Sequence, residues 1–117
     1  MIETVEEVKP IKDDYYNFKD FVSILINDTY DLLIEVSDEL YKLGNEHMAR
    51  QFETKADNIL SIYRSCENYK KETKVILKKI KELRKWVNQF HLEQSWYVNA
   101  ELDKIIANAT NRSGINA

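Results

Sequence analysis

The chain has 117 residues, with 17 basic and 20 acidic side chains and a net charge of −3, and this length is typical of one domain. It contains only two glycines and one proline, whereas sheet proteins need turn residues roughly every 8–12 positions and phosphate-binding loops need several glycines. The composition therefore excludes ordinary β-sandwiches, barrels and Gly-rich catalytic folds, and it predicts an all-α domain.

The first segment is acidic and ends in Pro10. A proline disfavours the helical conformation of the residue before it, so residues 1–10 are predicted to form a flexible, extended tail. The first helix is then expected to begin at Lys12 or Asp13 and to end at Leu43. Its apolar residues cover more than one stripe of the helix surface, which predicts that other helices contact it from several sides. The main stripe has spacings of three and four: Tyr15, Phe18, Val22, Leu25, Thr29, Leu32, Val36, Leu40 and Leu43.

A turn is expected at Gly44, because glycine commonly follows a helix C-terminus in the left-handed conformation. The apolar pattern restarts near Glu46 but is disturbed at residues 67–70 and again at 91–95. Ser95 is a candidate N-cap for the last helix, and Cys66 lies on the apolar seam. These boundaries predict one domain over residues 11–111, followed by a flexible tail over 112–117.

Two architectures fit these patterns. The preferred one is an antiparallel bundle of three or four helices, built from segments 12–43, 46–67, 70–91 and 96–110. The alternative is a helical hairpin in which residues 46–91 form one long helix. Its seam would resemble half of a coiled coil and would need a partner chain.

The composition also predicts a compartment. A single cysteine forms no intramolecular disulfide, and no zinc-binding spacing is present, so a reducing, cytoplasmic location is expected. The N-terminus lacks the apolar core of a signal peptide, and the longest apolar run, residues 24–26, is too short for a membrane span. The richness in Asn, Lys, Ile and Tyr is compatible with a low-GC bacterium, a phage or a mobile element.

Charge divides the chain into two parts. Residues 1–41 hold 11 acidic and 3 basic side chains, a balance of −8, while residues 42–117 hold 9 acidic and 14 basic ones, a balance of +5. The basic excess lies in an amphipathic run that could bind nucleic acid, an anionic lipid surface or an acidic groove, or simply form a solvated face. The candidate anion-binding residues are Lys70, Lys71, Lys74, Lys78, Lys81, Arg84 and Lys85, and the same basic run also contains Lys79.

Catalytic and metal-binding motifs are not predicted. Glu35, Asp38 and Glu39 resemble half of the paired ExxE…ExxD magnesium site of MazG-type pyrophosphohydrolases, but the second half has the wrong spacing. His47 and His91 belong to no ferritin-like or zinc-protease motif. We therefore expect a protein without enzymatic activity or cofactor.

Aromatic residues gather near both ends of the helical region, and pairing of the first helix with a later antiparallel one would bring the two groups together. Because Trp and Tyr dominate protein-binding hot spots, we predict a regulator, inhibitor or immunity-type adaptor that binds an unidentified protein, with a homodimer through the first helix as one form. The candidate binding residues are Phe18, Phe21, Ile24, Tyr30, Trp86, Phe90, Trp96 and Tyr97.

One family resemblance gives a further alternative. Length, helical layout, the glycine turn at Gly44 and the YxxxE pattern from Tyr97 to Glu101 resemble the WXG100 proteins of type VII secretion. Lys42 stands where that family has its defining tryptophan. The resemblance implies a helical hairpin that is exported, or that binds an exported partner, through a signal containing Tyr97 and Glu101.

Overall fold

The computed structural model describes the backbone of residues 2–64, 69–90 and 92–114, together with their side chains except at residues 2–16, 63–64 and 70. The described chain forms four helices and no strand: α1 (Ile2–Lys42), α2 (Glu46–Arg64), α3 (Tyr69–Asn88) and α4 (Glu93–Ser113). They form an elongated molecule of 64 × 24 × 20 Å. The predicted all-α bundle is confirmed.

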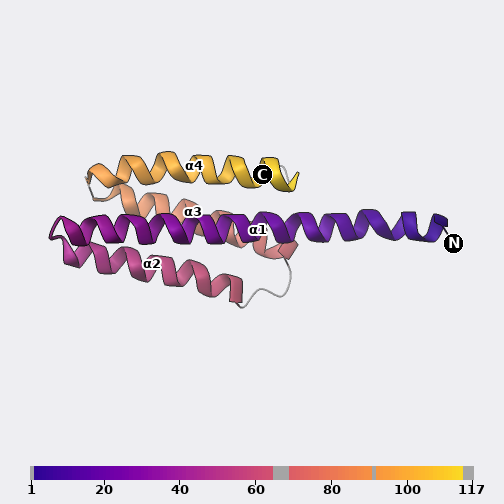
Figure 1. Cartoon of the computed structure of the whole chain (residues 1–117), viewed down its shortest axis with the longest axis horizontal. Coiled ribbons are helices and arrows are strands. Elements are labelled where there is room, and N and C mark those ends of the chain that lie inside the picture. Colours follow the sequence, from indigo (N-terminus) through magenta and orange to yellow (C-terminus); the bar gives the residue numbers. More distant parts are fainter. Residues whose placement is uncertain (1, 65–68, 91, 115–117) are drawn as a thin grey trace.

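The central element is α1, which packs against each of the other three helices. In Figure 1, α2 and α4 flank α1 on opposite sides and α3 lies behind it, and successive helices run in opposite directions. The alternative of one long helix over residues 46–91 is wrong, because α2 ends at Arg64 and α3 starts at Tyr69 and returns beside α2. The link at residues 65–68, with Cys66, lies outside the described residues.

The start of α1 differs from the prediction. The helix begins at Ile2 and passes through Pro10, so the expected extended conformation of residues 1–10 is wrong for residues 2–10. A proline inside a helix removes one N–H and costs about 3 kcal/mol, but this cost is local and does not force the chain on either side out of the helix. The N-terminal part of α1 projects beyond the other helices (Figure 1).

The turn at Gly44 is confirmed. Gly44 has a φ of 81°, a value that favours glycine because it has no Cβ. The Gly44 amide donates to the Tyr41 carbonyl at 3.1 Å, and the Asn45 amide donates to the Leu40 carbonyl at 2.9 Å, so the end of α1 is satisfied by the turn. The Asn45 side chain accepts from the Met48 amide at 3.3 Å and caps α2.

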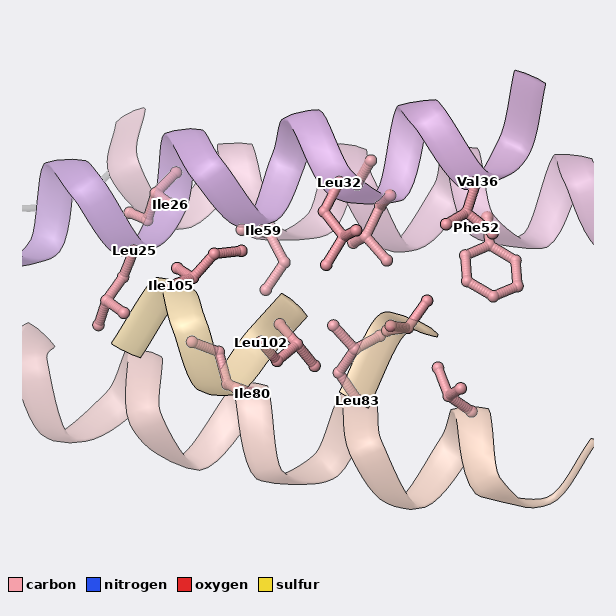
Figure 2. Packing of buried hydrophobic residues seen from close by; sticks show 14 of the residues in the cluster. Leu25, Ile26, Leu32, Val36, Phe52, Ile59, Ile80, Leu83, Leu102 and Ile105 are labelled. Carbon is pink, nitrogen blue, oxygen red and sulfur yellow. The ribbon is translucent and has the colours of Figure 1, made fainter. Parts of the chain in front are cut away.

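The core joins all four helices along the length of the bundle. Leu25, Leu32 and Val36 of α1 meet residues of α3 and α4 such as Ile80 and Leu102 (Figure 2). Ten residues of α1 between 21 and 40 are buried, which confirms that this helix is contacted from several sides. Burial of that whole face explains why its apolar surface is wider than one stripe.

Ser95 has a different role from the predicted N-cap. The N-cap of α4 is Leu92, which provides no side-chain cap, while buried Ser95 is the third residue of the helix. Its hydroxyl donates to the carbonyls of Val87 at 3.0 Å and Phe90 at 2.8 Å. Ser95 therefore satisfies the C-terminal end of α3 rather than the N-terminal end of its own helix.

The C-terminal end of α4 also extends further than predicted. The helix continues through Ser113, which is buried and whose hydroxyl donates to the Ala109 carbonyl at 2.6 Å. Gly114 then ends it in the left-handed conformation. Residues 112 and 113 thus belong to the bundle rather than to a tail, and residues 115–117 lie outside the described part of the chain.

Candidate functional site

Three large apolar side chains stand out from the described surface. Tyr41 is 38% exposed, Leu43 is 66% exposed and Trp96 is 79% exposed. Tyr41 and Leu43 lie where α1 turns into α2, and Trp96 lies in the first turn of α4, at the same end of the bundle (Figure 1). We call these three residues the end surface.

The neighbours of Trp96 hold it on a fixed backbone. Ser95, just before it, is anchored to the end of α3 by its two hydroxyl contacts. The hydroxyl of Tyr97, just after it, donates to a carboxylate oxygen of Glu35 on α1 at 3.0 Å. Trp96 is therefore presented outward by a helix start that is attached to both α1 and α3.

The Tyr97 hydroxyl lies in an acidic environment. Its hydrogen bond to Glu35 and the nearby carboxylates of Glu101 and Glu39 raise the pKa of Tyr97 above its ordinary value, because each disfavours a second negative charge. The hydrogen bond from Tyr97 to Glu35 therefore extends to a higher pH than the ordinary pKa of tyrosine would allow.

Polar contacts also fix the α1–α2 part of the end surface. The Ser37 hydroxyl is within hydrogen-bond distance of the Ala49 carbonyl at 2.8 Å and of a Glu53 oxygen at 3.3 Å. The hydrogen bond between Tyr41 and Glu53 raises the pKa of Tyr41, while Arg50 acts in the opposite direction. These contacts connect the last turns of α1 to α2. The backbone that carries exposed Leu43 is therefore held in place by hydrogen bonds between the two helices.

Carboxylates surround this end of the bundle. Asp38 and Glu39 are exposed near the end of α1, and Glu93 is exposed in the first turn of α4. Glu46 begins α2 and pairs with Arg50 at 2.5 Å. The end surface thus combines exposed apolar groups with several nearby carboxylates, while exposed Lys42 lies between Tyr41 and Leu43.

The predicted protein-binding residues are distributed differently from the expectation. Phe21 is fully buried and is not available to a partner, while Phe18, Ile24 and Tyr30 are half-buried along α1. The N-terminal and C-terminal aromatic groups do not converge. Because α2 reverses the chain before α3 begins, α3 runs in the same direction as α1 (Figure 1). Trp86 is near the C-terminal end of α3, toward the C-terminal end of α1, whereas Phe18 is in the N-terminal half of α1.

Trp86 and Phe90 belong to an internal contact between α2 and α3. The Trp86 ring meets Phe52 edge-on at 5.0 Å and Phe90 at 5.2 Å between centroids. The Lys55 ammonium nitrogen lies 5.0 Å from the Trp86 ring centroid, a cation–π distance. Trp86 therefore connects helices, whereas Trp96 is left to the solvent.

A groove of about 340 Å³ lies between α2 and α3, with Ile59, Ile62 and Leu83 among its lining residues. Two of its basic residues already have contacts: Lys55 lies over Trp86, and Lys79 pairs with Glu82 at 3.6 Å. The groove is open, but its basic lining is partly neutralised from within the chain.

The predicted anion-binding residues separate into three groups. Arg84 pairs with Asp103 of α4, and the Lys70 side chain lies outside the described side chains. Lys71, Lys74, Lys78, Lys81 and Lys85 are all exposed on α3. The sequence run is therefore reduced to these five lysines on the surface.

No metal centre is found among the described residues, where no three metal-ligating side chains gather at a suitable site. Glu35, from the carboxylate triplet, accepts a hydrogen bond from Tyr97. A ring nitrogen of His47 lies 2.7 Å from the Gln51 amide nitrogen, and His91 lies outside the described residues. Within the described ranges, no helix combines the length and apolarity needed to cross a bilayer.

The YxxxE pattern falls within α4, where both fixed residues have contacts inside the chain. Tyr97 donates to Glu35, and Glu101 pairs with Lys104 at 3.1 Å. The long second helix implied by the WXG100 resemblance is absent, because α2 and α3 are separate helices. Export that depends on Tyr97 and Glu101 stays a prediction.

Sequence reasoning included Trp96 but missed Tyr41 and Leu43 as surface groups. It placed Leu43 on the core stripe because the spacing of three from Leu40 continues. The available signal was the adjacent Gly44, because the residue beside a turn glycine leaves the helical register.

The chain matches no protein-family model, no curated protein and no solved structure at a significant level.

Proposed function

We propose that this protein is a non-enzymatic helical adaptor or regulator that binds another protein through the end surface. The observation that carries the proposal is the 79% exposure of Trp96 between two anchored neighbours. Exposed tryptophans on rigid elements are efficient binding anchors, because they bury a large area with little loss of side-chain freedom.

The chemistry of the end surface favours a particular kind of partner. Leu43 and Trp96 need an apolar pocket, while Asp38, Glu39 and Glu93 favour basic groups at its edge. The expected partner therefore has a hydrophobic cleft with Lys or Arg at its rim. The apolar face of α1 between residues 21 and 40 is covered within the chain, so the proposal does not use a homodimer through that face.

The first test is cross-linking in the cells of origin. A photo-reactive benzoylphenylalanine at position 96 should give one dominant protein adduct, and the same group at Ala107, an exposed position on the same helix, should not. Adducts of equal yield at both positions would contradict a site at the end surface.

The second test uses the purified partner. Trp96→Ala should weaken binding by about 2 kcal/mol or more, a factor of roughly 30, and Leu43→Ala by less. Asn108→Ala, exposed on α4, is the matched control and should bind normally in isothermal titration calorimetry. Unchanged affinity of Trp96→Ala would overturn the proposal.

A further inference from the structure

The strongest charged feature outside the end surface is a row of lysines on α3. Lys71, Lys74, Lys78, Lys81 and Lys85 follow one another at spacings of three, four, three and four, which place them on one helical stripe. All five are exposed, and the stripe covers about 21 Å at 1.5 Å per residue. We call these five residues the lysine row.

The row lies on the side of α3 that faces away from α1. Ile76, Ile80 and Leu83 point into the core that α3 shares with α1, and the lysine positions are on the opposite side of the helical wheel. The row is therefore an outer edge of the bundle and can meet a large, flat partner without rearrangement.

Ion pairs within the described residues leave the row largely uncompensated. Four ion pairs join Arg50 with Glu46, Lys79 with Glu82, Arg84 with Asp103 and Lys104 with Glu101. None of them includes Lys74, Lys78, Lys81 or Lys85. Lys79 and Arg84 of α3 are thus paired within the chain, whereas Lys74, Lys78, Lys81 and Lys85 lie outside the four ion pairs named above.

The acidic side chains of α1 do not cancel this charge. Exposed Asp31, Glu35 and Asp38 lie on the outward side of α1, and α1 and α3 pack through their inward faces. The two short dimensions of the bundle are 24 and 20 Å, whereas the Debye length is about 8 Å at physiological ionic strength. Each face therefore has its own local potential despite the net charge of −3.

We propose that the lysine row binds the phosphate backbone of duplex nucleic acid without reading its sequence. A duplex carries one phosphate per about 1.7 Å of axis, so a stretch as long as the row presents about 12 charges to five lysines. Lysine supplies point charges rather than the bidentate fork with which arginine reads bases. This activity is independent of the protein-binding function proposed above.

Two other anionic partners fit less well. Single-stranded nucleic acid is bound by aromatic stacking as well as charge, and no aromatic residue belongs to the row; Trp86 is packed against Phe52. A basic helix on a bilayer normally inserts an apolar face, but the apolar face of α3 is buried in the bundle. Electrostatic attraction is then the main contribution to binding, and it favours duplex nucleic acid because its phosphates are the most closely spaced.

The test is fluorescence anisotropy of the full chain with a labelled 20-base-pair duplex at 50 and 200 mM salt. Contacts with about four or five phosphates should weaken binding by roughly 150- to 500-fold over this range. Two duplexes of unrelated sequence should bind within about threefold of each other, because no bases are read.

Matched triple variants identify the surface. Lys74→Ser, Lys78→Ser and Lys81→Ser together should reduce the salt slope by about 2.7, the share of three phosphate contacts. Lys42→Ser, Lys104→Ser and Arg112→Ser change the net charge equally at exposed positions outside the row, and should leave the slope nearly unchanged. Circular dichroism of both variants should show the same helix content as the parent chain.

Four outcomes would overturn the proposal. The first is that the duplex does not bind at 50 mM salt, and the second is that both triple variants weaken binding equally, which would mean that only the overall charge of the protein matters. The third is that phosphatidylserine vesicles bind while the duplex does not, which would mean that the row binds a membrane surface. The fourth is that light scattering shows self-association at low salt without duplex binding. The last result would mean that the lysine row binds the acidic face of α1 in a second copy of the chain.

Discussion

The two tryptophans are ten positions apart in the chain but have opposite environments. Trp86 lies between Phe52 and Phe90, with Lys55 over its ring, while Trp96 is 79% exposed. The difference follows from position: half-buried Trp86 packs against Phe52 of α2, whereas Trp96 lies in the first turn of α4 at the end of the bundle. The same residue type thus packs between helices at one site and is exposed to solvent at the other.

The largest expected effect is on the enclosed side of this comparison. Phe52→Ala removes a fully buried ring that contacts Trp86 and should lower the free energy of unfolding by about 3–5 kcal/mol. Urea denaturation followed by circular dichroism measures it. A loss below about 1 kcal/mol would mean that the α2–α3 aromatic contact does not hold the bundle together.

A smaller effect on stability is expected at Ser95, which lies between the two tryptophans in the chain. Ser95→Ala removes the donor for the carbonyls of Val87 and Phe90 and should cost about 1–2 kcal/mol, because Ser95 is buried and a carbonyl loses its partner. The same denaturation experiment measures the change. Ser61→Ala, at an exposed position of α2, is the control and should stay within about 0.5 kcal/mol of the parent chain.

The exposed side should give almost no change in stability. Trp96→Ala removes a side chain that is mostly in solvent, so the free energy of unfolding should change by less than about 0.5 kcal/mol.

Tryptophan fluorescence measures the exposure of each indole separately, since Trp86→Phe leaves only Trp96 as an emitter and Trp96→Phe leaves only Trp86. Acrylamide should quench Trp96 much more strongly, and equal quenching would contradict the difference between the two sites.

The smallest effect is expected at alkaline pH, beside Trp96. The pKa of Tyr97 is raised above its ordinary value of 10.0, first by the hydrogen bond to Glu35. Because the folded pKa lies above the unfolded one, the stabilisation is complete below pH 10 and is lost as pH rises through the folded pKa. Tyr97→Phe should remove this part of the pH dependence in denaturation curves measured on both sides of pH 10, and an unchanged dependence would mean that the hydrogen bond is absent in solution.

The sequence predicted where the helices lie in the chain better than it predicted which helices pack against each other. Apolar spacing identifies which face of a helix is buried, and Gly44 located a turn because glycine readily adopts the left-handed conformation that follows a helix end. Spacing carries no information on which helix covers a face. The expected meeting of the two aromatic groups failed for this reason, since it depended on whether the helix that carries Trp86 runs antiparallel to α1 or in the same direction.

The candidate sites were predictable only in part. A lysine-rich run was visible in the sequence, but the pairing of Arg84 with Asp103 and of Lys79 with Glu82 depends on packing and on side-chain direction. Trp96 and Trp86 were indistinguishable by residue type. Their separation required the reversal of the chain around Ser95, a buried hydroxyl whose two acceptors belong to the preceding segment.

The place of α1 at the centre of the bundle has a consequence for biosynthesis. All three helices that cover α1 come after it in the chain, and chains fold as they are made from the N-terminus. When α1 leaves the ribosome, its wide apolar face has no cover; α2 shields part of that face through the local turn at Gly44, and the rest stays open until α3 and α4 are synthesised. A nascent chain stalled after α2 is therefore expected to leave part of the apolar face of α1 exposed to solvent.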